Sequence, residues 1–183
     1  MAQNENSRPA GQIMLIEVVS AYDLEFPKDI KNIDPYCVCS VGSTQIHRTA
    51  KVSKSSEPIW TITTHSLFLL NVEEYGESIE NGLEFRVEHS GIFRRANKAF
   101  DLGKVCIPYA EIMAGTGERK VYKLYKNANI NKSCGYLCLR FRCASEEDIK
   151  FIELKQRHPK LRAIRPTIYK ECPRIKHSSK PSE

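Results

Sequence analysis

Apolar and polar residues alternate along several short stretches of the chain, a pattern typical of half-buried β-strands. The clearest example lies at the start of the first predicted strand, where Met14, Ile16 and Val18 share one face. Short strands bounded by Gly, Asn, Ser or Pro are typical of an all-β sandwich. The strands are predicted near residues 12–20, 35–41, 44–50, 61–70, 82–89, 103–107, 119–124 and 134–142. The pattern therefore predicts an all-β fold, an eight-stranded antiparallel β-sandwich.

The pattern changes after the last predicted strand. Ser145 is followed by an acidic first turn that includes Asp148, which is typical of a helix start. Ile149 and Ile152 then indicate a short amphipathic helix that Pro159 stops. One helical turn is also expected over 109–113. The expected organisation is a disordered N-terminus (1–11), a sandwich domain (12–143), a short helix (144–157) and a basic, Pro-containing disordered tail (158–183).

Four motifs along the predicted sandwich occur in a characteristic order. They are Ala21-x-x-Leu24 with Asp34-Pro35-Tyr36, then Glu57-Pro58-Ile59-Trp60, then Asp101-Leu102-Gly103-Lys104, and finally Gly135-Tyr136-Leu137-Cys138-Leu139-Arg140. In this order the segment 12–143 resembles a C2 domain, the Ca²⁺ and phospholipid-binding β-sandwich family. The resemblance is to the permutation in which the Ala-x-x-Leu strand comes first. It implies a module that docks on membranes.

The resemblance also implies calcium-binding loops, because Ca²⁺ takes about six to eight oxygen ligands, many of them from aspartates. Asp34 and Glu88 stand at ligand positions, whereas Asp29 and Asp101 are each one residue out of register. Lys28 occupies a ligand position, and its charge repels a dication. These loops are therefore degenerate, and no cofactor is expected. The alternative role of Asp34, an aspartate before a proline, is to cap the loop backbone.

Apolar residues beside cations replace the missing acids. The expected membrane contacts are Phe26, Lys28, Ile92, Phe93, Arg94, Arg95 and Lys98. Each Lys or Arg near an anionic surface contributes about 1 kcal/mol, and burial of a Phe side chain adds about 1.5–3 kcal/mol. The alternative is that Ile92 and Phe93 fold back onto the sandwich.

A second basic cluster contains His47, Arg48 and Lys51, with Lys54 beyond it. Many C2 domains bind phosphoinositide head groups with a cluster at this place, and the resemblance implies the same here. The alternative is a solvated strand edge, because strict alternation does not bring Lys51 to the same face as His47.

Charge is distributed unevenly along the chain. From Lys150 onward there are ten Lys and Arg against three acidic residues, a net charge of +7, whereas the preceding part carries −1. A basic tail indicates an anionic partner: a membrane, a nucleic acid or an acidic protein. Nucleic acid is not favoured, because stacking needs aromatic residues and Tyr169 stands alone in the tail.

Signals of catalysis or secretion are absent from the sequence. There is no Gly-rich phosphate loop, Gly-x-Ser-x-Gly or His-Glu-x-x-His motif. The seven cysteines lack zinc-finger spacing and are expected as reduced, buried thiols. No apolar run reaches the roughly 18 residues of a membrane span, and no signal peptide is evident.

The sequence thus predicts a cytoplasmic, peripherally membrane-associated adaptor that is not an enzyme and binds anionic phospholipids without Ca²⁺. The alternatives are a C2 domain for protein–protein interaction, through its loops or basic tail, or an accessory module of a lipid-metabolising enzyme.

Overall fold

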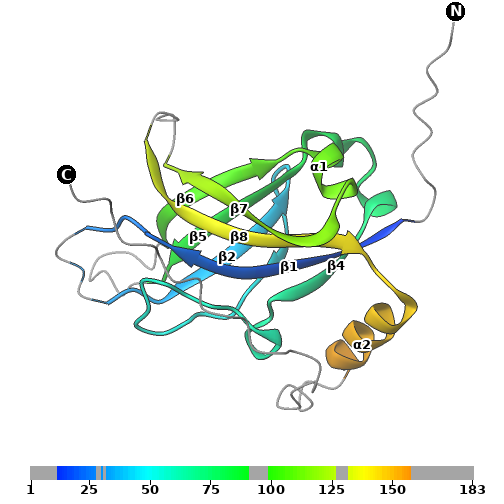
Figure 1. Cartoon of the computed structure of the whole chain (residues 1–183), viewed down its shortest axis with the longest axis horizontal. Coiled ribbons are helices and arrows are strands. Elements are labelled where there is room, and N and C mark those ends of the chain that lie inside the picture. The colour runs from blue at the N-terminus through cyan, green and yellow to red at the C-terminus, as the bar shows by residue number, and fades with distance from the viewer. Residues whose placement is uncertain (1–11, 28–29, 31, 91–98, 127–131, 158–183) are drawn as a thin grey trace, which may run out of the picture.

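The structure is a computed structural model, and it describes residues 12–27, 30, 32–90, 99–126 and 132–157. Eight strands and two α-helices make up most of this part (Figure 1). The strands are β1 (Ile13–Tyr22), β2 (Pro35–Val41), β3 (Thr44–Arg48), β4 (Leu67–Asn71), β5 (Leu83–His89), β6 (Phe100–Ile107), β7 (Thr116–Tyr125) and β8 (Ser133–Cys143). The helices are α1 (Tyr109–Met113) and α2 (Glu146–Arg157).

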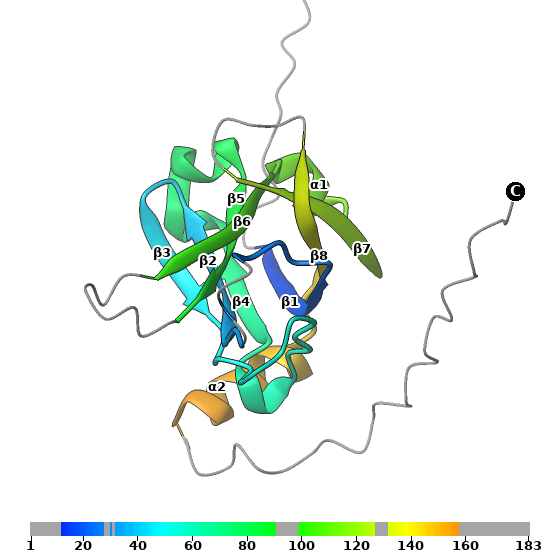
Figure 2. The same ribbon diagram turned by 90° about the vertical axis from the view of Figure 1, so that its left-hand side faces the viewer.

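The strands form one antiparallel sheet in the order β3-β2-β5-β6-β7-β8-β1-β4. Among the described residues, a single pair, Lys104 with Tyr125, joins β6 to β7. The sheet folds over at this weak link, and the two four-stranded halves face each other (Figure 2). The eight-stranded antiparallel sandwich predicted from the sequence is confirmed.

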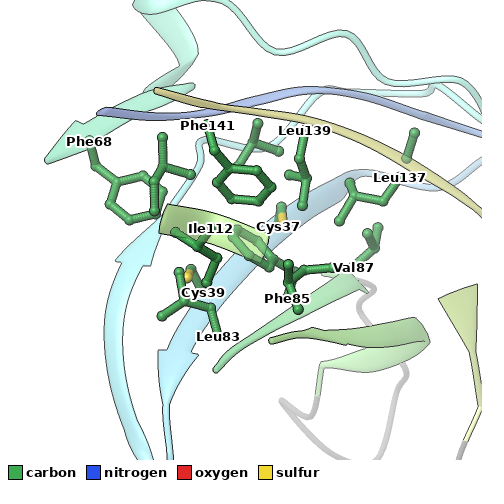
Figure 3. Packing of buried hydrophobic residues seen from close by; sticks show 14 of the residues in the cluster. Cys37, Cys39, Phe68, Leu83, Phe85, Val87, Ile112, Leu137, Leu139 and Phe141 are labelled. Carbon is green, nitrogen blue, oxygen red and sulfur yellow. The ribbon is translucent and has the colours of Figure 1, made fainter. Parts of the chain in front are cut away.

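The core lies between the two layers. On β5, Leu83, Phe85 and Val87 are buried and alternate with half-buried polar residues. Phe85 meets Phe141 of β8 edge to face, with ring centroids 6.2 Å apart (Figure 3). Cys37 of β2 is also part of this core, and burial raises the pKa of its thiol. β5 therefore buries one face, as its alternation requires, whereas β1 is buried on both faces from Met14 to Val19.

The predicted strand over 61–70 is wrong in its first half. A short 3₁₀ helix, η1 (Ile62–Thr64), comes first, and β4 begins only at Leu67. The Thr64 hydroxyl accepts a hydrogen bond from the N–H of Thr61 at 2.6 Å, and His65 adopts a left-handed φ of 59°. These local bonds divert the backbone from the sheet. A second 3₁₀ segment, η2 (Val72–Asn81), was not predicted.

Both predicted helical segments are present. The Ser145 hydroxyl accepts a hydrogen bond from the N–H of Asp148 at 3.2 Å, and the Asp148 carboxylate accepts one from the N–H of Ser145 at 2.8 Å. Arg142 of β8 binds the same carboxylate through two bonds, of 2.6 and 2.7 Å. Although burial opposes it, these bonds lower the pKa of Asp148 to about 2. The capping box thus also fastens α2 to the sandwich.

Neither helix in the described part of the chain has the length and apolar character needed to cross a membrane.

Candidate functional site

Three connections meet at one end of the sandwich, between β1 and β2, between β3 and β4, and between β5 and β6. Asp34 joins all three: its N–H donates to Nδ1 of His89 at 2.9 Å, and its carboxylate accepts the N–H of Lys54 at 2.8 Å. The Asp34 carbonyl accepts the N–H of Ser90 at 3.3 Å. We call this region, where Asp34 contacts Lys54, His89 and Ser90, the loop end.

Asp34 therefore has the loop-capping role expected for an aspartate before a proline. We expect Asp34→Ala to lower the free energy of unfolding by about 1 kcal/mol, because the N–H of Lys54 loses its acceptor. Asp34→Asn keeps an oxygen that can accept this bond and should retain most of the stability. Urea denaturation of both variants measures the difference. Equal losses would mean that the charge of Asp34, rather than the hydrogen bond, carries the effect.

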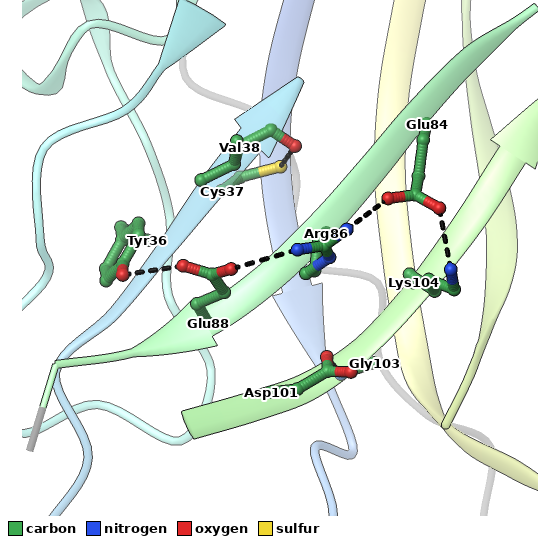
Figure 4. Close-up of polar contacts among 9 residues, drawn as sticks. All are labelled: Tyr36, Cys37, Val38, Glu84, Arg86, Glu88, Asp101, Gly103 and Lys104. Carbon is green, nitrogen blue, oxygen red and sulfur yellow. Dashed lines mark hydrogen bonds and ion pairs between the residues drawn. The ribbon is translucent and has the colours of Figure 1, made fainter. Parts of the chain in front are cut away.

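Glu88, a predicted calcium ligand, lies on the outer face of the sheet. Its carboxylate accepts the Tyr36 hydroxyl at 2.6 Å and lies 3.6 Å from the Arg86 guanidinium (Figure 4). The side chain that reaches Asp34 is instead the buried His89, which the sequence analysis did not select. The alternation of β5 could have identified it, because residues 83, 85, 87 and 89 share the inward face.

Asp101, the other predicted calcium ligand that the structure describes, lies opposite Glu88 in the sheet. Asp101 lies on β6, where its carboxylate accepts the N–H of Gly103 at 2.9 Å. Asp29 is outside the described residues. Within the described ranges, no three His, Cys, Asp or Glu side chains are arranged to hold a metal ion.

A chain of alternating charges crosses the outer face of β2, β5 and β6 (Figure 4). Glu88 contacts Arg86, Arg86 lies 2.5 Å from Glu84, and Glu84 lies 2.8 Å from Lys104. These ion pairs neutralise Arg86 and Lys104 on this face. Burial and the bond to Glu88 also raise the pKa of Tyr36 to about 12.

The predicted phosphoinositide cluster is divided by the strand β3. The ring of His47 stacks on Phe68 with centroids 4.2 Å apart, and Nε2 lies 2.7 Å from the carbonyl oxygen of His65. Burial lowers the pKa of His47 to about 4, so at neutral pH it is an uncharged packing residue. Arg48 is exposed, with its guanidinium 4.0 Å from the Tyr36 ring centroid, and Lys51 is exposed beyond the strand. These contacts favour a packing role for His47 over the expected role as a cation.

Phe26, predicted as an inserting loop tip, is half-buried and packs against the core. This packing leaves less of the Phe26 side chain available for insertion into a membrane. The remaining predicted membrane contacts, Lys28, Ile92, Phe93, Arg94, Arg95 and Lys98, lie outside the described residues, as do the segments 1–11 and 158–183.

An eight-stranded antiparallel sandwich with its loops gathered at one end defines the class of protein. The C2 domain model matches residues 12–124, more than half of the chain. The chain belongs to the C2 domain family, a family of membrane-binding modules.

Individual relatives are similar to part of this chain. Extended synaptotagmin-1 of the mouse is 31% identical over 109 residues, which cover 60% of this chain and 9% of the relative. The human protein of that name is 29% identical over 104 residues, or 57% of this chain and 8% of its own length. The matched region thus spans less than a tenth of these relatives.

Solved structures show the same fold. The C2A domain of a plant extended synaptotagmin 1 is similar with a TM-score of 0.54 and 22% identity, over 76% of this chain and 99% of that chain. The C2A and C2B domains of extended synaptotagmin 2 give a TM-score of 0.55 and 20% identity, over 85% of this chain and 52% of that chain.

Proposed function

We propose that this protein docks on anionic membranes through its loop end without Ca²⁺, as a non-enzymatic peripheral adaptor. The main support is that protein groups already engage Asp34 and Glu88, at two expected ligand positions. The N–H of Lys54 occupies an oxygen of Asp34, while Tyr36 and Arg86 engage Glu88. A carboxylate paired in this way has fewer free oxygens and less charge for a dication that needs about six to eight ligands.

Cations at and near the loop end supply the attraction to anionic lipid. Lys51 and Lys54 are exposed, and Arg94, Arg95 and Lys98 belong to the connection between β5 and β6. At about 1 kcal/mol for each cation near the surface, five of them give reversible binding that salt weakens. The basic residues from Lys150 onward add to this attraction.

Co-sedimentation with phosphatidylserine and phosphoinositide liposomes tests the calcium independence. We expect binding in EDTA, a similar level in millimolar Ca²⁺, and a decrease as salt rises, since salt screens exposed charges. Binding only in Ca²⁺ would show that Asp29 and Asp101 coordinate the ion after all. The absence of binding in both conditions would favour a protein partner instead.

The double variant Arg94→Glu with Arg95→Glu tests the loop assignment. It changes the charge by four units and should abolish liposome binding. The matched control is Arg119→Glu with Lys120→Glu, which makes the same charge change at exposed positions of β7 farther from the loop end. The control should retain binding. Equal losses in the two variants would show that only the total charge matters.

A further inference from the structure

The helix α2 turns the chain back along the sandwich toward the loop end. β8 begins beside the end of β1, where Tyr136 pairs with Tyr22, and it finishes beside the start of β1, where Cys143 pairs with Met14. The chain therefore leaves the sheet at the end opposite the loop end. In Figure 1, β8 ends on the right, and α2 passes from there back to the left, below β1 and β4.

The first turns of α2 are fixed to the sandwich at the end opposite the loop end. The Asp148 carboxylate binds the Arg142 guanidinium at 2.6 Å, and Arg142 pairs in the sheet with Leu15, near the start of β1. One turn later Ile152 is buried, and α2 lies against β4. The helix is therefore a fixed part of the fold and not a free extension of it.

The last turn of α2 lies nearer the loop end. The Lys155 ammonium group donates to the carbonyl of Ile62. The connection 60–66, which contains Ile62, joins β1 at Val18 and Val19 through two hydrogen bonds of 2.9 Å. From Leu15 to Val18, β1 advances about 10 Å toward the loop end. The helix rises about 10 Å between its two contacts, so α2 runs roughly parallel to β1 with its C-terminus toward the loop end.

The basic residues beyond α2 are concentrated in its immediate continuation. Residues 158–170 contain Lys160, Arg162, Arg165 and Lys170 and no acidic residue. Residues 171–183 contain three basic and two acidic residues, a net charge of +1. With four acidic and three basic side chains, α2 itself has a net charge of −1. The cations that could meet an anionic surface therefore follow the helix and do not belong to it.

We propose that α2 directs residues 160–165 to the lipid surface that the loop end contacts, where they form a second contact with anionic head groups. This inference rests on the proposed membrane function. The three cations of this segment lie within eight residues of Arg157, a reach of at most about 26–29 Å. β1 needs only about 13 Å from Val18 to Tyr22, so this reach includes the loop end. Cations near an anionic lipid surface are attracted to it.

The two contacts belong to one folded module, which strengthens the second contact. Once the loop end is on the membrane, the segment 160–165 binds at an effective concentration that the short connection from α2 keeps high. The same cations on a longer connection would bind more weakly, although the total charge would be unchanged. The length of this connection is therefore the variable to test.

A linker of about twenty Gly and Ser residues, inserted after Arg157 in the full chain, lengthens the connection without changing any charge. Binding to phosphatidylserine and phosphatidylcholine liposomes in EDTA should weaken about five- to tenfold, because effective concentration falls with roughly the −3/2 power of linker length. The matched control is the same insertion after Pro173, which leaves the segment 158–170 attached to α2 and should not change binding. Equal binding of the two variants would overturn the inference.

Charge reversal tests the segment itself. Lys160→Glu with Arg162→Glu should weaken liposome binding about tenfold or more, since two attractive charges become repulsive. Lys176→Glu with Lys180→Glu makes the same charge change farther along the chain and should have a much smaller effect. Equal losses in the two variants would mean that α2 places no particular segment at the membrane, which would overturn the inference.

A lipid-anchored gadolinium chelate locates the contact directly. In phosphatidylserine bicelles that contain it, the amide signals of residues 160–165 in the ¹⁵N-labelled full chain should broaden together with those of 51–54 at the loop end. The signals of 116–118 and 144–148, at the opposite end, should remain sharp. Broadening of 51–54 without 160–165 would overturn the inference.

The two proposals fail in different ways. The absence of wild-type binding to liposomes would overturn the membrane function and this inference with it. If the wild type binds and Arg94→Glu with Arg95→Glu abolishes binding, whereas the linker after Arg157 has no effect, the membrane function stands and only the role of α2 is overturned.

Discussion

Replacing Gly103 with alanine is expected to lower the free energy of unfolding by about 3 kcal/mol or more. Gly103 lies on β6 with a φ of +143°, a conformation that side-chain-bearing residues rarely adopt. A Cβ there would lie 2.5 Å from Sγ of Cys134 and 3.0 Å from Cβ of Leu124, which is fully buried. Backbone strain costs about 1–3 kcal/mol, and overpacking of a tight site costs a similar amount.

Two further variants separate the strain from the steric clash. Gly117→Ala introduces a side chain at a φ of +87°, where the nearest neighbouring atom, Cδ of Arg142, is 3.5 Å away. It should therefore show only the strain, about 1 kcal/mol or slightly more. Cys134→Ala in the Gly103→Ala background removes the closer clash and should recover part of the loss. Urea denaturation measures the free energy of unfolding of all three variants. Equal losses of stability in Gly103→Ala and Gly117→Ala would contradict the steric account.

The strands were predictable because one physical rule governs them. A strand with one buried face must alternate, and Leu83, Phe85 and Val87 follow this rule along β5. The segment 61–66 has the composition of a strand, but the Thr64 hydroxyl binds the backbone of Thr61 and starts a 3₁₀ turn. β-propensity does not account for such local side-chain bonds, so the start of β4 was predicted too early.

The candidate site was predictable in position but not in its contacts. The motif around Asp34 correctly indicated a loop that ends in a capping aspartate. Its bond to His89 spans 55 residues, and the Tyr36–Glu88 bond spans 52, so no local spacing could reveal either pair. The sequence could have shown that His47 and Arg48 do not share a face, because adjacent residues of a strand point to opposite faces.

Acidification is expected to destabilise the fold through His47. Burial in the stack with Phe68 disfavours the charged ring and lowers its pKa from 6.5 to about 4, with a smaller contribution from the Lys155 charge. The unfolded chain therefore binds a proton at higher pH than the folded one. The stability contributed by neutral His47 is fully present above about pH 6.5 and is lost as the pH falls toward 4. At about 1.4 kcal/mol per pH unit, the loss is about 2–3 kcal/mol.

The variant His47→Gln isolates this effect, because its side-chain amide can donate a hydrogen bond to the carbonyl of His65 but does not titrate. Between pH 6.5 and 4, its free energy of unfolding should fall by about 2–3 kcal/mol less than that of the wild type. Urea titrations at each pH measure both curves, and NMR titration of the imidazole reports the pKa of His47 directly. Parallel curves, or a His47 pKa near 6.5, would mean that the ring is solvated and could act as a head-group cation after all. A flattened curve would instead establish His47 as a neutral link between the edge strands β3 and β4, which leaves Arg48 and Lys51 as the cations available from the predicted cluster.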